Sequence, residues 1–475
     1  MIIPKYTKKE IKQLEKSVHE KILGSWISNE DLDKEVKIFT AGEGCWLYDI
    51  HGRKILDTFS SLITTAVGHG RIEIGEAMLE QMKSLEFFPI YHDGFTIPQI
   101  KLAEKLAEIA PGDLEVTCFV NSGSEANEFA IKMARQYFWQ TGQPNRTKVI
   151  ARRGSYHGAT IGTTAVTGFA TLRTVSTPVP GCLFAPQVKC AQCEFGLKYP
   201  SCKLCCLKGL EKLIQSEGPD TIAAIIIDPL PGSDSGYPLA PKEYIQGVRK
   251  LCDKYGILLI FDEVQTGFGK TGYWFACEYY GVVPDFLDTS KAITSGYQPL
   301  GAVITKKKIA DVFKQGPGSE FRTGSTYGGH TLACVAALKN LEIFEREHLV
   351  EHARDLGKYI ARRFKELKKY SVVDSISGIG TLWAIELKST NKPHGIQIRN
   401  CCREIPESAR RCAECAGSIG AWIRDWCWEN GMILRNNGNM LVIAPALVMT
   451  YEEFDLVMDF LHKGIQAAMK HFKIK

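Results

Sequence analysis

The stretch Gly256-Ile-Leu-Leu-Ile-Phe-Asp262 decides the fold, because an uninterrupted apolar run ends on a carboxylate. A second such run is Ile222-Ala-Ala-Ile-Ile-Ile227. Apolar residues at consecutive positions are typical of strands that are covered on both faces of a parallel sheet. Helical stretches alternate with short strands on the N-terminal side of these runs. We therefore predict an α/β fold with a mostly parallel central sheet and helices on both faces.

The pattern changes toward both ends of the chain. Beyond Thr331 the sequence predicts helices over Leu332–Arg354 and Leu356–Lys369, a strand over Thr381–Leu387, and a helix from Tyr451 onward. A charged helix is predicted over residues 10–35. We expect a large domain over residues 76–335, and a smaller α+β domain built from the N-terminal segment 1–75 and the C-terminal segment 336–475.

Composition excludes several classes of protein. The 475 residues are 45% hydrophobic and 23% charged with a net charge of +5, which is ordinary for a globular chain and argues against disorder. The basic residues are scattered, so nothing favours nucleic acid as a partner. No apolar run approaches the length of about 20 residues that spans a membrane, and the N-terminus becomes polar almost at once, with no apolar stretch typical of a secretory signal. We expect a cytoplasmic protein with reduced cysteines.

One segment predicts an anion site. Asn121-Ser-Gly-Ser-Glu-Ala-Asn127 follows a short strand and opens an amphipathic helix. A helix start of this kind gathers free backbone N–H groups and hydroxyls at its positive end, which suits a phosphate group. The alternative is an ordinary helix cap provided by the Ser124 side chain.

Two further residues carry chemistry. Asp262 ends a predicted buried strand, at the sheet edge where α/β proteins bind ligands, and there it would need a cationic partner. Lys291 lies among small and apolar residues, where desolvation favours the neutral amine that forms a Schiff base. The alternatives are an acid that caps the next turn and a surface lysine.

Taken together, these segments resemble the class III, omega-amino-acid aminotransferases, which are pyridoxal phosphate (PLP) enzymes of fold type I. The resemblance implies that Lys291 holds PLP as a Schiff base and moves the proton, and that Asp262 pairs with the ring nitrogen. Thr326 matches a threonine that binds the phosphate of the neighbouring subunit, which implies a homodimer with shared active sites. The other implied PLP contacts are Gly123 and Ser124 at the phosphate, Tyr156 and Val264 on the two ring faces, Gln265 at the phenolic oxygen, and His157.

The resemblance also implies amino transfer from an omega-amino acid or related amine to a keto acid. Ser233 replaces an acid that masks a substrate-binding arginine in glutamate-using relatives, so we expect pyruvate rather than 2-oxoglutarate. Arg435 lies where several relatives bind a substrate carboxylate, although a structural salt bridge is the alternative. A lyase that eliminates ammonia or phosphate, a racemase, and a non-enzymatic metal-bearing protein remain alternative functions.

Two windows are rich in cysteine. Of the 16 cysteines, six lie in residues 182–206 and four in residues 401–415. Both windows lack helix or strand periodicity, and we predict inserted loops. The paired spacing of Cys190, Cys193, Cys202 and Cys205 would suit a structural zinc ion, with an iron–sulfur cluster or free thiols as alternatives.

Overall fold

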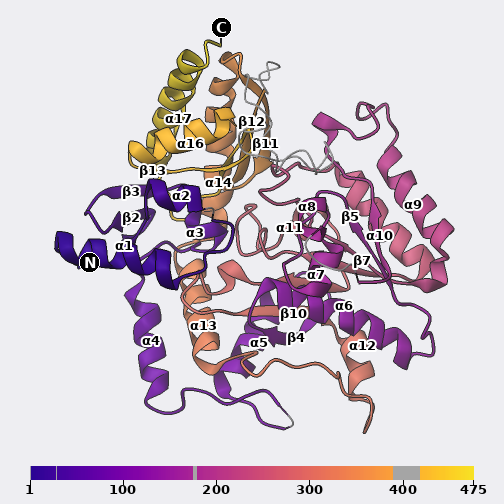
Figure 1. The fold of residues 1–475 in the computed structure, drawn as a ribbon. Coiled ribbons are helices and arrows are strands. Elements are labelled where there is room, and N and C mark those ends of the chain that lie inside the picture. Colours follow the sequence, from indigo (N-terminus) through magenta and orange to yellow (C-terminus); the bar gives the residue numbers. More distant parts are fainter. Residues whose placement is uncertain (1, 28, 92, 175–178, 389–417, 475) are drawn as a thin grey trace.

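A computed structural model of the chain describes residues 2–27, 29–91, 93–174, 179–388 and 418–474 (Figure 1). Within these ranges the largest sheet has seven strands in the order β4-β10-β9-β8-β7-β5-β6. The strands from β9 to β6 pair in parallel, whereas β10 is antiparallel to both of its neighbours. The bounds are β4 (Leu114–Val120), β5 (Lys148–Arg152), β6 (Cys182–Ala185), β7 (Ile222–Ile227), β8 (Leu258–Asp262), β9 (Phe286–Thr289) and β10 (Gly301–Lys306). The predicted mostly parallel sheet is confirmed.

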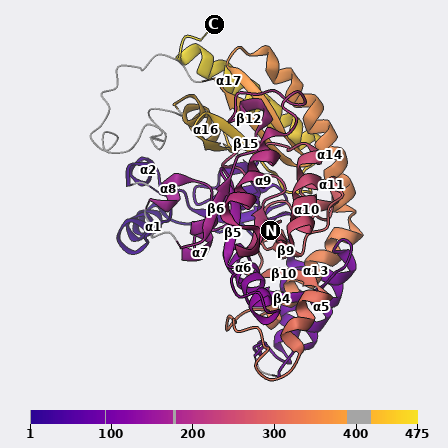
Figure 2. The same ribbon diagram turned by 90° about the vertical axis from the view of Figure 1, so that its right-hand side faces the viewer.

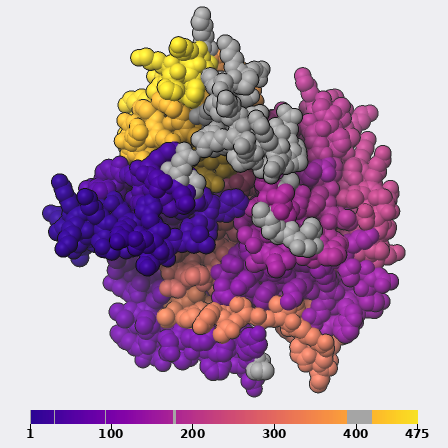
Figure 3. Space-filling model, viewed as in Figure 1, coloured from indigo at the N-terminus to yellow at the C-terminus, as the bar shows by residue number. Residues whose placement is uncertain are grey.

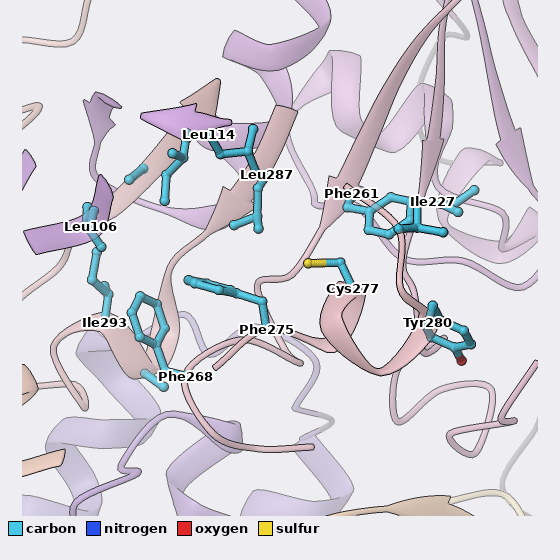
Figure 4. Close-up of a cluster of buried hydrophobic side chains, with 14 of the residues drawn as sticks. Leu106, Leu114, Ile227, Phe261, Phe268, Phe275, Cys277, Tyr280, Leu287 and Ile293 are labelled. Atoms are coloured by element: carbon cyan, nitrogen blue, oxygen red, sulfur yellow. The ribbon is translucent and has the colours of Figure 1, made fainter. Parts of the chain in front are cut away.

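Helices cover both faces of this sheet, with α6 and α7 on one side and α10, α11 and α13 on the other (Figure 2). Ile260 packs in the layer beneath α6, and the next residue, Phe261, packs in the opposite core beside Leu287 (Figure 4). Because successive side chains point to opposite faces, both faces must be apolar. The helices of this domain are α4 (Ile72–Met82), α5 (Ile97–Ile109), α6 (Gly123–Gln140), α7 (Ile161–Val166), α8 (Ala170–Arg173), α9 (Cys205–Glu217), α10 (Lys242–Tyr255), α11 (Ala276–Tyr280), α12 (Lys307–Ala310) and α13 (Thr331–Arg346).

The two ends of the chain meet in a smaller α+β unit, as expected (Figures 1 and 3). β13 pairs in parallel with β3, so that Met432 lies opposite Leu56. The limits of the domains at residues 75 and 335 stay a prediction, and α13 runs across the second of them. The strands of the smaller unit are β1 (Phe39–Glu43), β2 (Trp46–Asp49), β3 (Lys54–Asp57), β11 (Val373–Ile379), β12 (Leu382–Leu387), β13 (Met432–Ile433), β14 (Arg435–Asn437) and β15 (Met440–Ile443). Its helices are α1 (Lys8–Lys21), α2 (Asn29–Lys34), α3 (Ser60–Ile63), α14 (Leu349–Phe364), α16 (Ser418–Glu429) and α17 (Tyr451–His471).

Three local predictions were wrong. Residues 182–206 are not one inserted loop, since Cys182 begins β6 in the central sheet and Cys205 begins α9. Cysteine behaves as a small apolar residue, so Cys182-Leu-Phe-Ala185 can pair as a core strand. The C-terminal helices part near residue 348 rather than near 355, because His348 has a left-handed backbone with φ of 50°. The helix predicted over residues 10–35 is two helices, α1 and α2.

Over the described residues, every helix is too short or too polar to span a membrane.

Lys270 ties three parts of the chain together at the junction of the two domains. Its side chain is fully buried, and its Nζ donates to Ser60 Oγ at 3.0 Å and to the Pro445 carbonyl oxygen at 2.9 Å. Burial lowers the pKa of Lys270 from 10.5 to about 7, against an opposing effect of the Asp57 carboxylate. Between these two values the folded protein binds fewer protons than the unfolded chain, so its stability rises with pH.

The variant Lys270→Met should lack this pH-dependent gain. Relative to the variant, the wild-type protein should gain up to about 1.4 kcal/mol of unfolding free energy per pH unit above about pH 7.5. Urea unfolding at several pH values between about 7.5 and about 9.5 measures this difference. The variant Lys250→Met, which alters an exposed lysine on α10, is the matched control. A difference between wild type and Lys270→Met that does not change with pH would contradict the assignment.

Candidate active site

A cavity of about 140 Å³ lies at the carboxyl ends of the parallel strands, beside the N-terminus of α6. It brings together residues from well-separated parts of the sequence. Its lining consists of Ser122, Gly123, Ser124, Asn127, Tyr156, His157, Gly158, Asp228, Leu230, Gly232, Asp262, Val264, Gln265, Ser290 and Lys291. Among the residues expected to contact PLP, Thr326 alone does not line this cavity and is exposed to solvent.

The start of α6 forms an anion cradle. The helix cap is Ser122, whose side chain accepts from the Glu125 N–H at 3.2 Å, and not Ser124 as the alternative interpretation held. Ser124 Oγ instead accepts from the Ala159 N–H at 3.2 Å. The N–H groups of the first helical turn have no acceptor within the helix. A Cβ atom on Gly123 would lie 2.7 Å from Val264 Cγ1, so only glycine fits here. The cradle therefore fits a phosphate group.

Asp262 is buried and held by three donors. Its Oδ2 accepts from Asn127 Nδ2 at 2.8 Å and lies 2.8 Å from His157 Nδ1, and its Oδ1 accepts from the Val264 N–H at 3.1 Å. Hydrogen bonds to a carboxylate favour its charged form. With Nδ1 of His157 as the donor, the carboxyl group accepts three hydrogen bonds, and its acceptor oxygens suit a protonated ring nitrogen in the cavity.

Lys291 reaches the same cavity from the segment after β9. Burial lowers the pKa of its ammonium group, while the carboxylates of Asp262 and Asp234 act in the opposite direction. Its φ of 41° lies in the left-handed region, where a residue with a side chain is strained. Strain of this kind persists where the surrounding structure enforces it, and it is frequent at functional sites. The geometry presents an amine that can exchange its proton inside the cavity.

Tyr156 and Gln265 belong to two separate segments of the cavity wall. Tyr156 remains protonated, because burial raises the pKa of its hydroxyl group, with smaller effects of Asp234 and Asp262 in the same direction. Gln265 Oε1 accepts from the Ser233 N–H at 3.4 Å. Ser233 lies behind the cavity wall, where its carbonyl oxygen accepts from Asn437 Nδ2 at 2.9 Å. Arg435 begins β14 and is exposed.

Asp228 belongs to a buried ion pair. Its Oδ1 accepts from Arg152 Nη2 at 2.7 Å and from Ser155 Oγ at 2.5 Å, and Arg152 also donates to the Asp228 carbonyl oxygen. Breaking a buried pair by removing one partner leaves an uncompensated charge, which destabilises a fold by about 3–5 kcal/mol. The pair therefore fixes the ends of β5 and β7 relative to each other.

The expected zinc site is not supported. Cys190, Cys193, Cys202 and Cys205 border one small pocket and are free thiols. Within the described ranges, no group of three or more His, Cys, Asp or Glu side chains could hold a metal ion. Short-range sequence spacing does not fix the direction of each thiol, and η1 (Cys190–Gln192) and α9 orient these cysteines separately. The window 401–415 lies outside the described residues.

Comparisons with known proteins agree with this geometry. The family model of the class III aminotransferases matches residues 27–465. The putrescine–pyruvate aminotransferase of Pseudomonas aeruginosa is 32% identical over 440 residues, which cover 91% of this chain and 91% of that protein. The beta-alanine–pyruvate aminotransferase of the same organism is 32% identical over 453 residues, which cover 92% of this chain and 94% of that protein.

A solved structure extends the similarity to the whole fold. An amine transaminase from an uncultivated Pseudomonas species, crystallised in a PLP-bound form, superposes with a TM-score of 0.85 at 31% identity. The match covers 94% of this chain and 98% of that chain. The predicted fold type I class is confirmed, and the alternative of a non-enzymatic binding protein was wrong. The chain belongs to the class III aminotransferases.

Proposed function

We propose that the protein is a PLP-dependent transaminase that moves the amino group of an omega-amino acid or related amine to pyruvate. One observation carries the proposal: a buried amine, Lys291, and a buried carboxylate, Asp262, meet in one cavity beside the start of α6. The residues fit PLP, because the cavity offers an anion cradle at Gly123 and Ser124 and a carboxylate for a ring nitrogen. Free thiols in the described residues support a cytoplasmic location, where disulfides are rare.

PLP, when bound, supplies an aldehyde carbon that exchanges amines and a ring that takes up the electron pair of a broken C–H bond. Lys291 Nζ would attach the group and, once displaced by the amine substrate, would take the substrate's α proton and return it to another carbon. The lowered pKa of Lys291 leaves this nitrogen free to accept a proton. Asp262 would hold a proton at the ring nitrogen.

The remaining residues of the cavity would orient the group and exclude water. Tyr156 and Val264 would cover the two faces of the ring, and His157 and Asn127 would keep the Asp262 carboxylate aligned. Gln265 would donate from its amide nitrogen to the phenolic oxygen, because its Oε1 faces the Ser233 N–H. The same residues would serve both halves of a reaction in which the amine reacts first and the keto acid second.

Charged side chains outside the cavity wall bear on which substrates the site accepts. Asp234 is close enough to influence both Lys291 and Tyr156 electrostatically. Arg435 is exposed at the start of β14, and we propose that it binds a substrate carboxylate. Ser233, whose carbonyl oxygen accepts from Asn437 of the same strand, carries no charge that would mask this arginine, which supports pyruvate as the acceptor.

An apolar surface supports the proposed homodimer. Large side chains on α4, on α5, on the segment between them and next to Thr326 are about half or more exposed: Leu79, Met82, Phe88, Tyr91, Phe95, Ile97, Ile100 and Tyr327. A cavity of about 530 Å³ lies among them, lined partly by Phe95, Thr323 and Ser325. Exposed apolar surfaces of this kind mark protein interfaces. We propose that a second copy of the chain covers it and that each Thr326 binds the phosphate in the other subunit.

The variant Lys291→Ala tests the core of the proposal. Loss of the residue that attaches the cofactor and moves the proton should lower the rate of amino transfer by at least about a hundredfold. The visible absorbance of PLP linked to protein should also disappear, while Lys250→Ala should retain both properties. Retention of either the absorbance or the rate in Lys291→Ala would refute the assignment.

The identity of the keto acid is tested by comparing acceptors. With a panel of omega-amino acids and amines as donors, pyruvate should support faster turnover than 2-oxoglutarate, because Ser233 leaves Arg435 unmasked. The reverse ranking would refute this interpretation of Ser233. Turnover without any keto acid would instead favour the lyase or racemase alternative, since neither of those reactions needs an acceptor.

Mixed dimers test the shared site. Lys291→Ala and Thr326→Asp should each be inactive, because one lacks the amine and the other repels the phosphate. If Thr326 acts across the interface, one site of each mixed dimer is intact, and an equal mixture should recover about a quarter of wild-type activity. The gain is measured after the subunits are unfolded and refolded together. No gain beyond the separate variants would contradict a site shared between subunits.

A further inference from the structure

Asp288 is a buried carboxyl group that the proposed mechanism leaves without a role. It lies in β9, and its side chain is inaccessible to solvent. In the part of the chain that the structure describes, neither of its carboxyl oxygens has a hydrogen-bond partner. Buried acids are normally paired or hydrogen-bonded, so an acid with neither requires an explanation.

The position of Asp288 in the sheet places it beside Asp262. β8 and β9 are parallel, and Asp262 lies in register with Asp288. The residues just before them, Phe261 and Leu287, point into the core on the opposite face (Figure 4). Because side chains alternate along a strand, both acids point toward α6. Neighbouring strands are about 4.8 Å apart, so the two carboxyl groups are adjacent.

Among the residues that the structure describes, the one charged group that acts on Asp288 is the Asp262 carboxylate. Burial raises the pKa of Asp288 well above its usual range, and the Asp262 carboxylate adds to this effect. β10 faces Asp288 with Val303, and α6 turns Ala126 and Asn127 toward this side of the sheet. His157 bonds to the Asp262 carboxylate, and that carboxylate acts to raise the pKa of Lys291. Neither His157 nor Lys291 is among the groups that shift the pKa of Asp288.

Two adjacent buried carboxyl groups cannot both be ionised at low energetic cost. The negative charge settles on the member with more hydrogen-bond donors, and Asp262 has Asn127, His157 and the Val264 N–H. Asp288 has none among the described residues, so it takes the proton.

We propose that Asp262 and Asp288 form a carboxyl pair that holds a single proton, with Asp288 as the neutral acid. This inference rests on the proposed function for its role: the pair presents one unit of negative charge to the ring nitrogen instead of two. Asp288 is then a positioning residue, which acts through Asp262 and limits the field that Asp262 and Lys291 experience. The titrations of the two groups are coupled, so an apparent pKa measured for the loss of this proton belongs to the pair rather than to either residue.

The test compares the wild-type chain with Asp288→Asn, each with and without PLP, by urea unfolding between about pH 5 and about pH 8. Folded wild-type protein keeps a proton on Asp288 that the unfolded chain loses, so wild-type stability falls as pH rises in this window. The ratio of the wild-type unfolding constant to that of Asp288→Asn should therefore rise by up to about tenfold per pH unit. A ratio that stays constant with pH would overturn the inference.

Two further variants separate pairing from burial alone. In an Asp262→Asn background the neighbouring charge is gone, so Asp288 should ionise in the folded protein at a lower pH. The ratio of the unfolding constants with and without Asp288 should therefore stop rising at a lower pH. An unchanged end point would overturn the pairing. Asp374→Asn makes the same chemical change at an exposed position of β11 and is the control. Asp288→Ala repeats the measurement if Asp288→Asn does not fold.

The measurements with PLP distinguish this inference from the proposed function. A protein that shows the pH trend but binds no PLP would refute the proposed function and leave the carboxyl pair standing. A protein that binds PLP but shows no pH trend would refute the pair alone.

Discussion

A carboxylate buried at the end of a central strand must be met by hydrogen-bond donors and by a cation, and Asp262 imposes this requirement on everything around it. Asn127 reaches it from the second turn of α6, and His157 reaches it from the segment after β5. These two hydrogen bonds position α6 and the segment after β5 against the end of β8. In our proposal the cation that completes the arrangement is the protonated ring nitrogen of PLP. The start of α6 and Lys291 line the same cavity as Asp262, as this proposal requires.

Three buried acids lie at the carboxyl ends of the neighbouring strands β7, β8 and β9, and each is accommodated in a different way. Asp228, just beyond β7, is neutralised by Arg152 within the protein. Asp262, at the end of β8, is solvated by side-chain and backbone donors and left open to a ligand. Asp288, in β9, has neither kind of partner among the described residues and is held neutral in our proposal. In this account, Asp262 is the one of the three acids that offers an uncompensated negative charge to a ligand.

Much of this was predictable from local sequence. Apolar runs predicted the parallel strands, and the acid after one run and the lysine among small residues predicted two of the groups that the cavity joins. Asn127 lay inside the helix-start motif but carried no sign that its amide would reach Asp262. Partners of this kind depend on register between strands that are distant in sequence. The resemblance between paired cysteine spacing and metal sites misled for a related reason, since spacing does not orient thiols.

Side-chain chemistry at the end of β9 was also hidden from the sequence, because Asp288 becomes unusual only when the sheet places it beside Asp262. Lys291 follows three residues later, and its attachment to PLP is the central claim. The most direct test is to load the protein with PLP, reduce it with borohydride, and locate the modified residue by peptide mass spectrometry. The account predicts a phosphopyridoxyl group on Lys291. Modification of a different lysine, or of none, would contradict it.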